Sequence, residues 1–210
     1  MIDYELLKTS IITFAVVIVS LTVHEVSHGF VSYLLGDDTA KSMGRLTLNP
    51  IKHIDIIGAV CMFVFKFGWA KAVPINPNRY KNFRLGTVIV SIAGPLSNLI
   101  MAFVATVVYG YLVVKTSVSN DIVYEFIITF IILNISLAIF NLIPISPLDG
   151  SKILLAFLPE RAYRFLLKYE KYGFVVIIAL SYFGLLSGVI DRGLNVVLNS
   201  FLDITEKILI

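Results

Sequence analysis

Charged residues and cysteines are scarce in this chain, and each shortage excludes a class of protein. Asp, Glu, Lys and Arg together make up 15% of its 210 residues, whereas a water-soluble domain carries about 25%. The single cysteine, Cys61, excludes an intramolecular disulfide and a cysteine-based zinc knuckle. With 58% hydrophobic residues and a mean hydropathy of +0.89, the chain is predicted to be an integral membrane protein embedded in a lipid bilayer.

Positive charge is in modest excess, and its distribution indicates a membrane rather than nucleic acid. The net charge is +3; eight of the 17 basic residues lie in segment 36–85 and five in segment 150–171. Lysine and arginine gather in the cytoplasmic loops of membrane proteins. We therefore expect no nucleic-acid partner and a multi-pass protein of the cell membrane. Both basic segments should be cytoplasmic, with the N-terminus and the connection 115–121 outside.

Long hydrophobic runs, by contrast, are abundant. A helix that crosses the hydrocarbon core needs about 20 apolar residues, and the sequence has runs of about this length at roughly 9–35, 86–114, 122–146 and 170–190. The first run is longer than a signal-peptide core and no small-residue cleavage site follows it, so we expect a retained helix. The predicted fold class is an all-α polytopic membrane protein with about four transmembrane helices.

Two segments outside these runs have patterns of their own. Segment 36–85 is punctuated by Gly, Pro and Asn, and its "GRLTLN" stretch alternates like a short strand. We expect a small membrane-associated β-hairpin or sheet at 44–67, after the first helix. In the tail 191–210, apolar residues recur at helical spacing opposite Asn and Asp residues. This spacing predicts a C-terminal amphipathic helix that lies at the membrane interface.

The chain shows no internal repeat and no low-complexity stretch that would divide it. We therefore expect a single membrane-embedded domain over residues 1–210. Its core would cover about 9–155, and residues 156–210 would add an accessory helix and the amphipathic tail. The sequence alone does not set the oligomeric state.

The stretch "HEVSHG" puts three ionisable side chains into the second half of the first apolar run. His24 and His28 are four residues apart, so a helix projects both imidazoles from one face, where both can reach one Zn²⁺ at about 2.0–2.1 Å. Glu25 is rotated off that face and can approach a metal-bound water without being a ligand, as in the H-E-x-x-H motif. Because ionisable groups inside a span are costly and normally mark function, we predict a zinc site with Glu25 as general base.

A catalytic zinc takes three protein ligands and keeps a fourth position open for water, so one more ligand is needed. The remaining histidine, His53, lies in the basic segment, and the acidic residues at the ends of the other spans are Asp121, Glu125 and Asp149. Only Asp149 lies at the inner end, at the depth of the two histidines. Prolines before it and a glycine after it predict an unwound chain that presents its carboxylate to a cavity.

Four stretches, "HEVSHG", "GRLTLNPIKHID", "AGPLSN" and "FNLIPISPLDG", resemble in this order and spacing the site-2 protease family of M50-type intramembrane zinc metalloproteases. The resemblance covers roughly residues 15–155 and fits a small form without PDZ or CBS domains. It implies one zinc ion per chain, held by His24, His28 and Asp149, with Glu25 as catalytic base. It also implies a three-helix catalytic core whose active site faces the cytoplasm.

Two asparagines lie in otherwise apolar runs close to these residues. Asn98 belongs to "AGPLSN" and Asn141 to "FNLIPISPLDG". Hydrogen bonds between helices account for many asparagines in membrane spans, whereas the resemblance puts both positions at the border of the active site. We therefore treat Asn141 and Asn98 as candidate substrate-binding residues, and Asn141 as a candidate to hold the substrate backbone or the developing oxyanion.

The predicted function is hydrolysis of peptide bonds within or near transmembrane segments of membrane-protein substrates, that is, regulated intramembrane proteolysis. A zinc or cation transporter is one alternative, but transporters usually place polar groups along a path across the membrane, often within internal repeats. Here the polar groups cluster at one depth and no repeat is visible. A catalytically inactive scaffold of the same fold is another alternative, and the complete set of ligands and base argues against it.

Reporter fusions test the predicted orientation. Fusions after residues 78 and 165 should report a cytoplasmic location and a fusion after residue 118 an external one, because the basic segments stay inside. Alkaline phosphatase and green fluorescent protein, read in parallel at each position, give opposite signals on the two sides. An external location of residue 78 would invert the orientation and remove the depth argument for Asp149.

Overall fold

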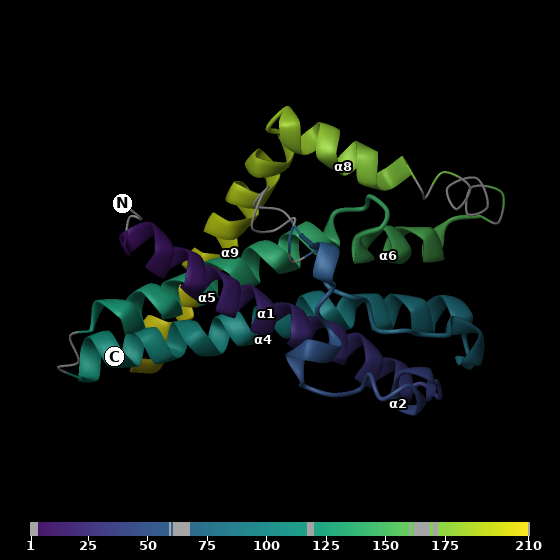
Figure 1. Ribbon diagram of the computed structural model, residues 1–210, viewed down its shortest axis with the longest axis horizontal. Coiled ribbons are helices and arrows are strands. Elements are labelled where there is room, and N and C mark those ends of the chain that lie inside the picture. Colours follow the sequence, from purple (N-terminus) through teal and green to yellow (C-terminus); the bar gives the residue numbers. More distant parts are fainter. Residues whose placement is uncertain are drawn as a thin grey trace.

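The computed structural model describes residues 4–58, 60, 68–116, 120–159, 161, 169 and 172–209. Within these ranges every named element is a helix (Figure 1). The α-helices are α1 (Tyr4–Leu34), α2 (Thr39–Ser42), α4 (Phe83–Lys115), α5 (Asp121–Leu142), α6 (Asp149–Phe157), α8 (Gly173–Tyr182) and α9 (Leu185–Leu209). Two short 3₁₀ turns, η1 (Pro50–Lys52) and η2 (Pro77–Arg79), lie between α2 and α4.

Three of these helices, α1, α4 and α5, are long and apolar enough to cross a membrane. They correspond to the first three predicted spans, so the prediction of a multi-pass, helical membrane protein is confirmed. The helices begin where asparagine side chains accept hydrogen bonds from unpaired backbone N–H groups: Asn82 caps α4 and Asn120 caps α5. Helix α4 is central, because it contacts α1, α5, α6 and α9.

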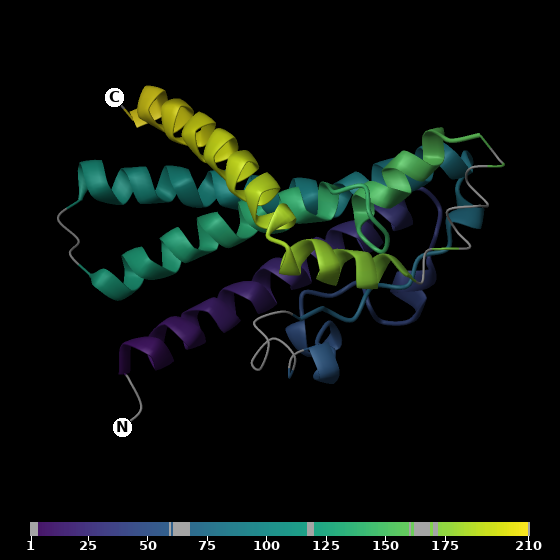
Figure 2. The ribbon, with the colours of Figure 1, turned by 90° about the horizontal axis from the view of Figure 1, so that it is seen from above.

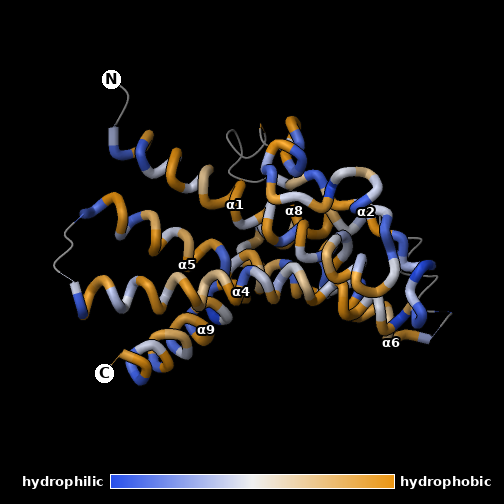
Figure 3. The backbone as a smooth tube through the Cα atoms, turned by 90° about the horizontal axis from the view of Figure 1, so that it is seen from below, coloured by the Kyte–Doolittle hydropathy of each residue, from blue (hydrophilic) through white to orange (hydrophobic). Residues whose placement is uncertain are grey.

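The chain directions place the loops at two opposite ends of the bundle. Figure 2 shows both termini at the end where α4 finishes and α5 begins, whereas α2 and α6 lie at the opposite end. Hydrophobic residues follow α1, α4 and α5 along their length, and hydrophilic residues gather at helix ends and around α2 (Figure 3). The described parts of segment 36–82 and segment 143–159 therefore lie at the same end of the bundle, which agrees with the charge pattern.

The predicted fourth span, 170–190, is not one continuous helix. Helix α8 ends at Tyr182, α9 begins at Leu185, and the two are bent by 81°, so together they form a broken span or a re-entrant segment. Gly184 makes the break possible, because its φ of +70° is a backbone conformation that residues with a side chain rarely adopt. The apolar run in this part of the sequence predicted apolar helix, but it did not predict the break and the bend between α8 and α9.

The C-terminal amphipathic helix is confirmed as a helix, but its apolar face is covered by protein. A buried cluster of Ala102, Ile131 and Ile135 packs against the apolar face of α9, formed by Leu194, Val197, Leu198 and Phe201. Figures 1 and 2 show α9 crossing obliquely over α4 and α5. A helix lying free at the membrane interface would bury that face in lipid. Part of the apolar face thus packs on the bundle, and the predicted position at the membrane interface stays a prediction.

The predicted β-hairpin at 44–67 is wrong for the part that the structure describes. Residues 44–49, the "GRLTLN" stretch, form turns and bends, and η1 follows them. The one trace of sheet pairing in the described ranges is an isolated antiparallel bridge between Ile54 and Ala70. Residues 59 and 61–67 of the prediction lie outside the described residues. Alternation predicts a strand only where a neighbouring strand pairs with it, and turns at Gly44 and Pro50 leave too little length for one.

A buried carboxylate ties the chain after α1 to the segment before α4. Asp37 has a fully buried side chain and accepts hydrogen bonds from Ser32 Oγ (2.9 Å), Asn76 N (2.6 Å) and Thr39. Ser32 Oγ also contacts Tyr80 Oη at 2.8 Å. Burial raises the pKa of Asp37, but the hydrogen bonds from Thr39, Asn76 and Ser32 outweigh it, so the pKa lies below its usual value. Because the pKa of Asp37 is lower in the folded protein than in the unfolded chain, its ionised carboxylate stabilises the fold at pH values above the ordinary carboxyl pKa. That stabilisation is lost as the pH falls from there through the lower pKa of the folded state.

Replacement of this carboxylate should destabilise the protein, and its neighbour provides the control. Asp37→Ala leaves buried donors unpaired, at about 1–3 kcal/mol each, so the melting temperature in detergent should fall by about 5 °C or more. Asp38→Ala removes an exposed ion pair with Arg79, which is worth at most about 1 kcal/mol. Equal melting temperatures for the two variants, measured by intrinsic fluorescence, would contradict the structural role of Asp37.

Candidate active site

Three atoms that could bind a metal ion lie close together in the interior of the helix bundle. Helix α1 projects His24 and His28 from one face, and Asp149 is the first residue of α6. Asp149 Oδ2 lies 3.2 Å from His24 Nε2 and 3.1 Å from His28 Nε2, and the two nitrogens are 3.1 Å apart. All three side chains are buried. The structure thus brings together the three residues that the sequence predicted as metal ligands.

Hydrogen bonds on the far side of each ring indicate which nitrogen carries the hydrogen. His28 Nδ1 lies 2.7 Å from the backbone carbonyl oxygen of Val90, which can only accept, so Nδ1 is the donor. His24 Nδ1 lies 2.6 Å from the side-chain oxygen of Asn98. In a neutral imidazole the other nitrogen then presents a lone pair. Both Nε2 atoms therefore direct lone pairs at each other and at the Asp149 carboxylate.

Three buried acceptors so close together repel one another unless a cation lies between them. Two imidazole nitrogens and one carboxylate oxygen are a donor set that suits a catalytic zinc, with a fourth position left for water. Gly94 of α4 leaves the space for this arrangement. A Cβ at Gly94 would lie 2.4 Å from His28 Nε2 and 2.6 Å from His24 Nε2, so any other residue would displace the rings. The residues present fit a zinc ion.

Asp149 is held from both sides. The segment Ile143–Leu148 between α5 and α6 is not helical, as the prolines in the sequence predict. Gly150 permits a close approach here, since a Cβ on it would lie 2.2 Å from the carbonyl oxygen of Leu142. The second carboxylate oxygen, Oδ1, accepts a hydrogen bond from Lys152 Nζ at 3.1 Å. One oxygen of Asp149 thus faces the histidines and the other is neutralised by a lysine that the sequence analysis did not single out.

Glu25 lies beside the three ligand residues without joining them. It lines a cavity of about 480 Å³ together with His24, His28, Asp149 and Lys152. Its Oε2 atom accepts a hydrogen bond from Val73 N at 2.8 Å. The segment before Val73 is held in turn by Arg45, whose Nη2 donates to the carbonyl oxygen of Lys71 at 2.8 Å. The Glu25 carboxylate therefore lies on the wall of the same cavity that the three potential ligands line.

The two asparagines have different positions. Asn141 lines the cavity, and its Nδ2 donates to the carbonyl oxygen of Leu137 at 2.9 Å. Asn98 is fully buried behind the ring of His24 and does not line the cavity within the described residues. Its amide is occupied by His24 and by Asn134 of α5. The geometry thus suits Asn141 for contact with a substrate, whereas it joins Asn98 to His24, a potential metal ligand.

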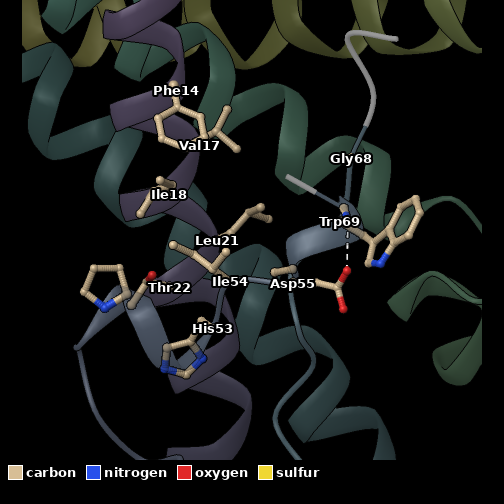
Figure 4. Close-up of a pocket in the computed structure, with 13 residues that line it drawn as sticks. Phe14, Val17, Ile18, Leu21, Thr22, His53, Ile54, Asp55, Gly68 and Trp69 are labelled. Atoms are coloured by element: carbon tan, nitrogen blue, oxygen red, sulfur yellow. Dashed lines mark hydrogen bonds between the residues drawn. The ribbon is translucent and has the colours of Figure 1, made fainter. Parts of the chain in front are cut away.

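A second, smaller pocket of about 40 Å³ lies between α1 and the loops around residues 50–58 and 68–70 (Figure 4). Its walls are mainly apolar, from Phe14 to Thr22 on the helix. His53 Nε2 lies 2.8 Å from the carbonyl oxygen of Thr47, and Asp55 Oδ1 accepts from Gly58 N at 2.8 Å. Both polar side chains therefore support the local chain, and neither belongs to the group of potential ligands.

Comparison with known proteins agrees with this geometry. The profile of peptidase family M50 matches residues 110–184. "Putative zinc metalloprotease YwhC" of Bacillus subtilis (strain 168) is 43% identical over 167 residues, which cover 78% of this chain and 76% of the relative. "Putative zinc metalloprotease Rip2" of Mycolicibacterium smegmatis (strain ATCC 700084 / mc(2)155) is 26% identical over 168 residues, 78% of this chain and 63% of that protein.

No solved structure gave a significant match to the chain. The assignment therefore rests on the sequence similarity to these relatives and on the buried group of two histidines and an aspartate. At 43% identity, the similarity to the Bacillus subtilis relative extends over about three quarters of both proteins. The chain belongs to peptidase family M50, a family of zinc metalloproteases.

Proposed function

We propose that this protein is an intramembrane zinc metalloprotease that hydrolyses peptide bonds within or near the transmembrane segments of membrane-protein substrates. The observation that carries the proposal is the meeting of His24, His28 and Asp149 within hydrogen-bonding distance, with Glu25 on the wall of the same cavity. Both histidines and the glutamate belong to a helix that is long and apolar enough to span a bilayer. Such residues inside a span normally serve function.

The site is proposed to open toward the cytoplasm. His24 and His28 lie in the second half of α1, and Asp149 follows the inner end of α5. The basic residues of segments 36–85 and 150–171 mark that end as the cytoplasmic one. The whole chain, residues 1–210, is proposed to act as one membrane-embedded unit, in which α8 and α9 pack against the core.

The chemistry is divided among the residues around the cavity. His24, His28 and Asp149 would hold one zinc ion, which when bound polarises the attacking water and the scissile carbonyl. Glu25 removes the proton from that water and later delivers it to the leaving amine. Lys152 neutralises the outer oxygen of Asp149 and so keeps the inner one directed at the histidines. Asn141, on the cavity wall, is proposed to donate to the substrate backbone or to the developing oxyanion.

The distribution of polar groups supports a protease over a zinc or cation transporter. The potential ligands, Glu25, Asn141 and Lys152 all line one cavity. A transport path needs polar groups at successive depths across the membrane. The outer halves of α1, α4 and α5 include Thr106 of α4, whose hydroxyl donates to its own helix, and a group at the outer end in which Lys8 and Thr9 contact Glu125. None of these residues lines the cavity. A catalytically inactive scaffold of this fold would not need His24, Glu25, His28 and Asp149 to be intact.

Metal content tests the ligand set. The purified protein should hold about one zinc per chain, because three ligands converge on one site, and the double variant His24→Ala, His28→Ala should lose most of it. His53→Gln is the matched control, since His53 lies outside the group and glutamine can still donate to Thr47 O. Inductively coupled plasma mass spectrometry gives the ratio. Stoichiometric zinc in the double variant would refute the assignment.

Glu25→Gln separates catalysis from metal binding. The variant should keep zinc, because no ligand changes, and should lose about 10²–10⁴-fold in cleavage rate, because an amide cannot accept the proton. Asp149→Asn should instead weaken both zinc binding and cleavage. The assay combines metal analysis with cleavage of transmembrane peptides in detergent micelles.

The same preparations distinguish the alternatives. A transporter would move Zn²⁺ across the bilayer of proteoliposomes and would cut no peptide of a broad panel. An inactive scaffold would bind zinc and do neither. Either pattern in the wild-type protein would overturn the proposed function, whereas cleavage by wild type and not by Glu25→Gln supports it.

A further inference from the structure

The two histidines of the candidate metal site are held in the same tautomer by different means. His28 Nδ1 contacts a backbone carbonyl directly, that of Val90. His24 Nδ1 contacts only the side-chain amide of Asn98, and an amide can turn to present either its oxygen or its nitrogen. A turned Asn98 would direct its NH₂ group at His24 and favour the tautomer with hydrogen on Nε2. In that tautomer Nε2 has no lone pair to offer to a metal.

Asn134, in the middle of α5, restrains the Asn98 amide. Both asparagine side chains are fully buried. Asn98 Nδ2 donates to Asn134 Oδ1 at 2.8 Å. Asn134 Nδ2 donates in turn to the carbonyl oxygen of Phe130 and to Ser20 Oγ, each at 2.8 Å. Both N–H groups of Asn134 are therefore used, and its oxygen is the atom left to face Asn98.

The direction of this whole chain of hydrogen bonds follows from one backbone atom. The carbonyl oxygen of Phe130 can only accept, so the Asn134 atom beside it must be the nitrogen. If Asn134 turned, its oxygen would face the Phe130 oxygen and its nitrogen would face Asn98 Nδ2. Two repulsive contacts between buried groups would result. The remaining contact of Asn98, from Nδ2 to the carbonyl oxygen of Ser20, is longer at 3.4 Å and restrains it less.

We propose that Asn134 is a positioning residue of the metal site, which acts through Asn98 to keep the Nε2 lone pair of His24 directed at the metal. The proposal rests on the proposed function, because it concerns the same ion. Partners that orient a metal-ligating histidine typically contribute 10–100-fold to metal affinity or activity. The hydrogen bonds described for Asn134 go to Asn98, Ser20 and Phe130 and not to a potential ligand, so its effect has to pass through the amide of Asn98.

The test compares Asn134→Leu with two control variants in the full-length protein. Leucine has a similar shape but cannot accept from Asn98, so the Zn²⁺ dissociation constant, measured by competition with a chelator, should rise about 10–100-fold. The visible spectrum of bound Co²⁺ should change as well, because His24 is no longer held. Ser20→Ala removes one acceptor but leaves Phe130 O as the anchor, and Ile135→Val changes only packing beside Asn134. Both controls should stay within about threefold of wild type.

A purely structural role would give a different result. It would lower the melting temperature of the metal-free protein and leave the Zn²⁺ dissociation constant and the Co²⁺ spectrum of Asn134→Leu unchanged, which overturns the proposal. A wild-type protein that binds no metal would instead refute the proposed function. If Asn134→Leu does not fold, ¹⁵N spectra of histidine in the zinc-loaded wild type decide. Hydrogen on His24 Nδ1 is the expected state, and its absence there would also overturn the proposal.

Discussion

Mutual repulsion among three buried acceptors is the constraint on which the rest of the site depends. Two imidazole nitrogens and a carboxylate oxygen lie about 3 Å apart, and with both rings neutral such an arrangement needs a cation between the three atoms. Four neighbouring residues support this arrangement of His24, His28 and Asp149. Gly94 supplies the space, Val90 and Asn98 orient the rings, and Lys152 compensates the outer carboxylate oxygen.

The apolar surroundings make each of these polar contacts matter more than it would in water. Within a bilayer no solvent can replace a missing hydrogen bond, so buried polar groups must find partners inside the protein. Ser20, Asn98 and Asn134 come from α1, α4 and α5 and satisfy one another. Their contacts also join the three helices near the metal site. The same hydrogen bonds thus support the packing of the core and the chemistry of His24.

The cavity wall is completed by chain that is not helical. The segment that ends at Val73 contacts Glu25, and the unwound stretch before Asp149 brings the carboxylate to the histidines. Asp37 holds the chain just after Val73 close to the end of α1 through Asn76. A hydrophobic cluster of Leu148, Ile177 and Leu186 holds the second against α8 and α9. The broken helix pair at the C-terminal side therefore packs against the unwound segment before Asp149.

Local patterns were sufficient to predict the parts of the protein that depend on neighbours in the chain. Apolar runs predicted α1, α4 and α5, the spacing of His24 and His28 predicted a shared face, and depth along the spans selected Asp149. These inferences succeed because helical periodicity and the thickness of a bilayer translate sequence directly into position. Asn141 likewise lies on the cavity wall, beside the unwound segment that its motif predicts.

Only the tertiary structure decided what depends on contacts between distant segments. The alternation in 44–49 suggested a strand, but no partner strand pairs with it in the described residues. The apolar face of α9 could contact lipid or protein equally well. In the structure, part of that face packs against Ala102 and Ile135. The sequence by itself determined the three long apolar helices, the side of α1 that carries the histidines, and the residues able to hold a metal. The partners of Asn98, the place of Lys152 and the bend at Gly184 required the fold, because hydrogen-bond geometry and close packing exist only once the helices have met.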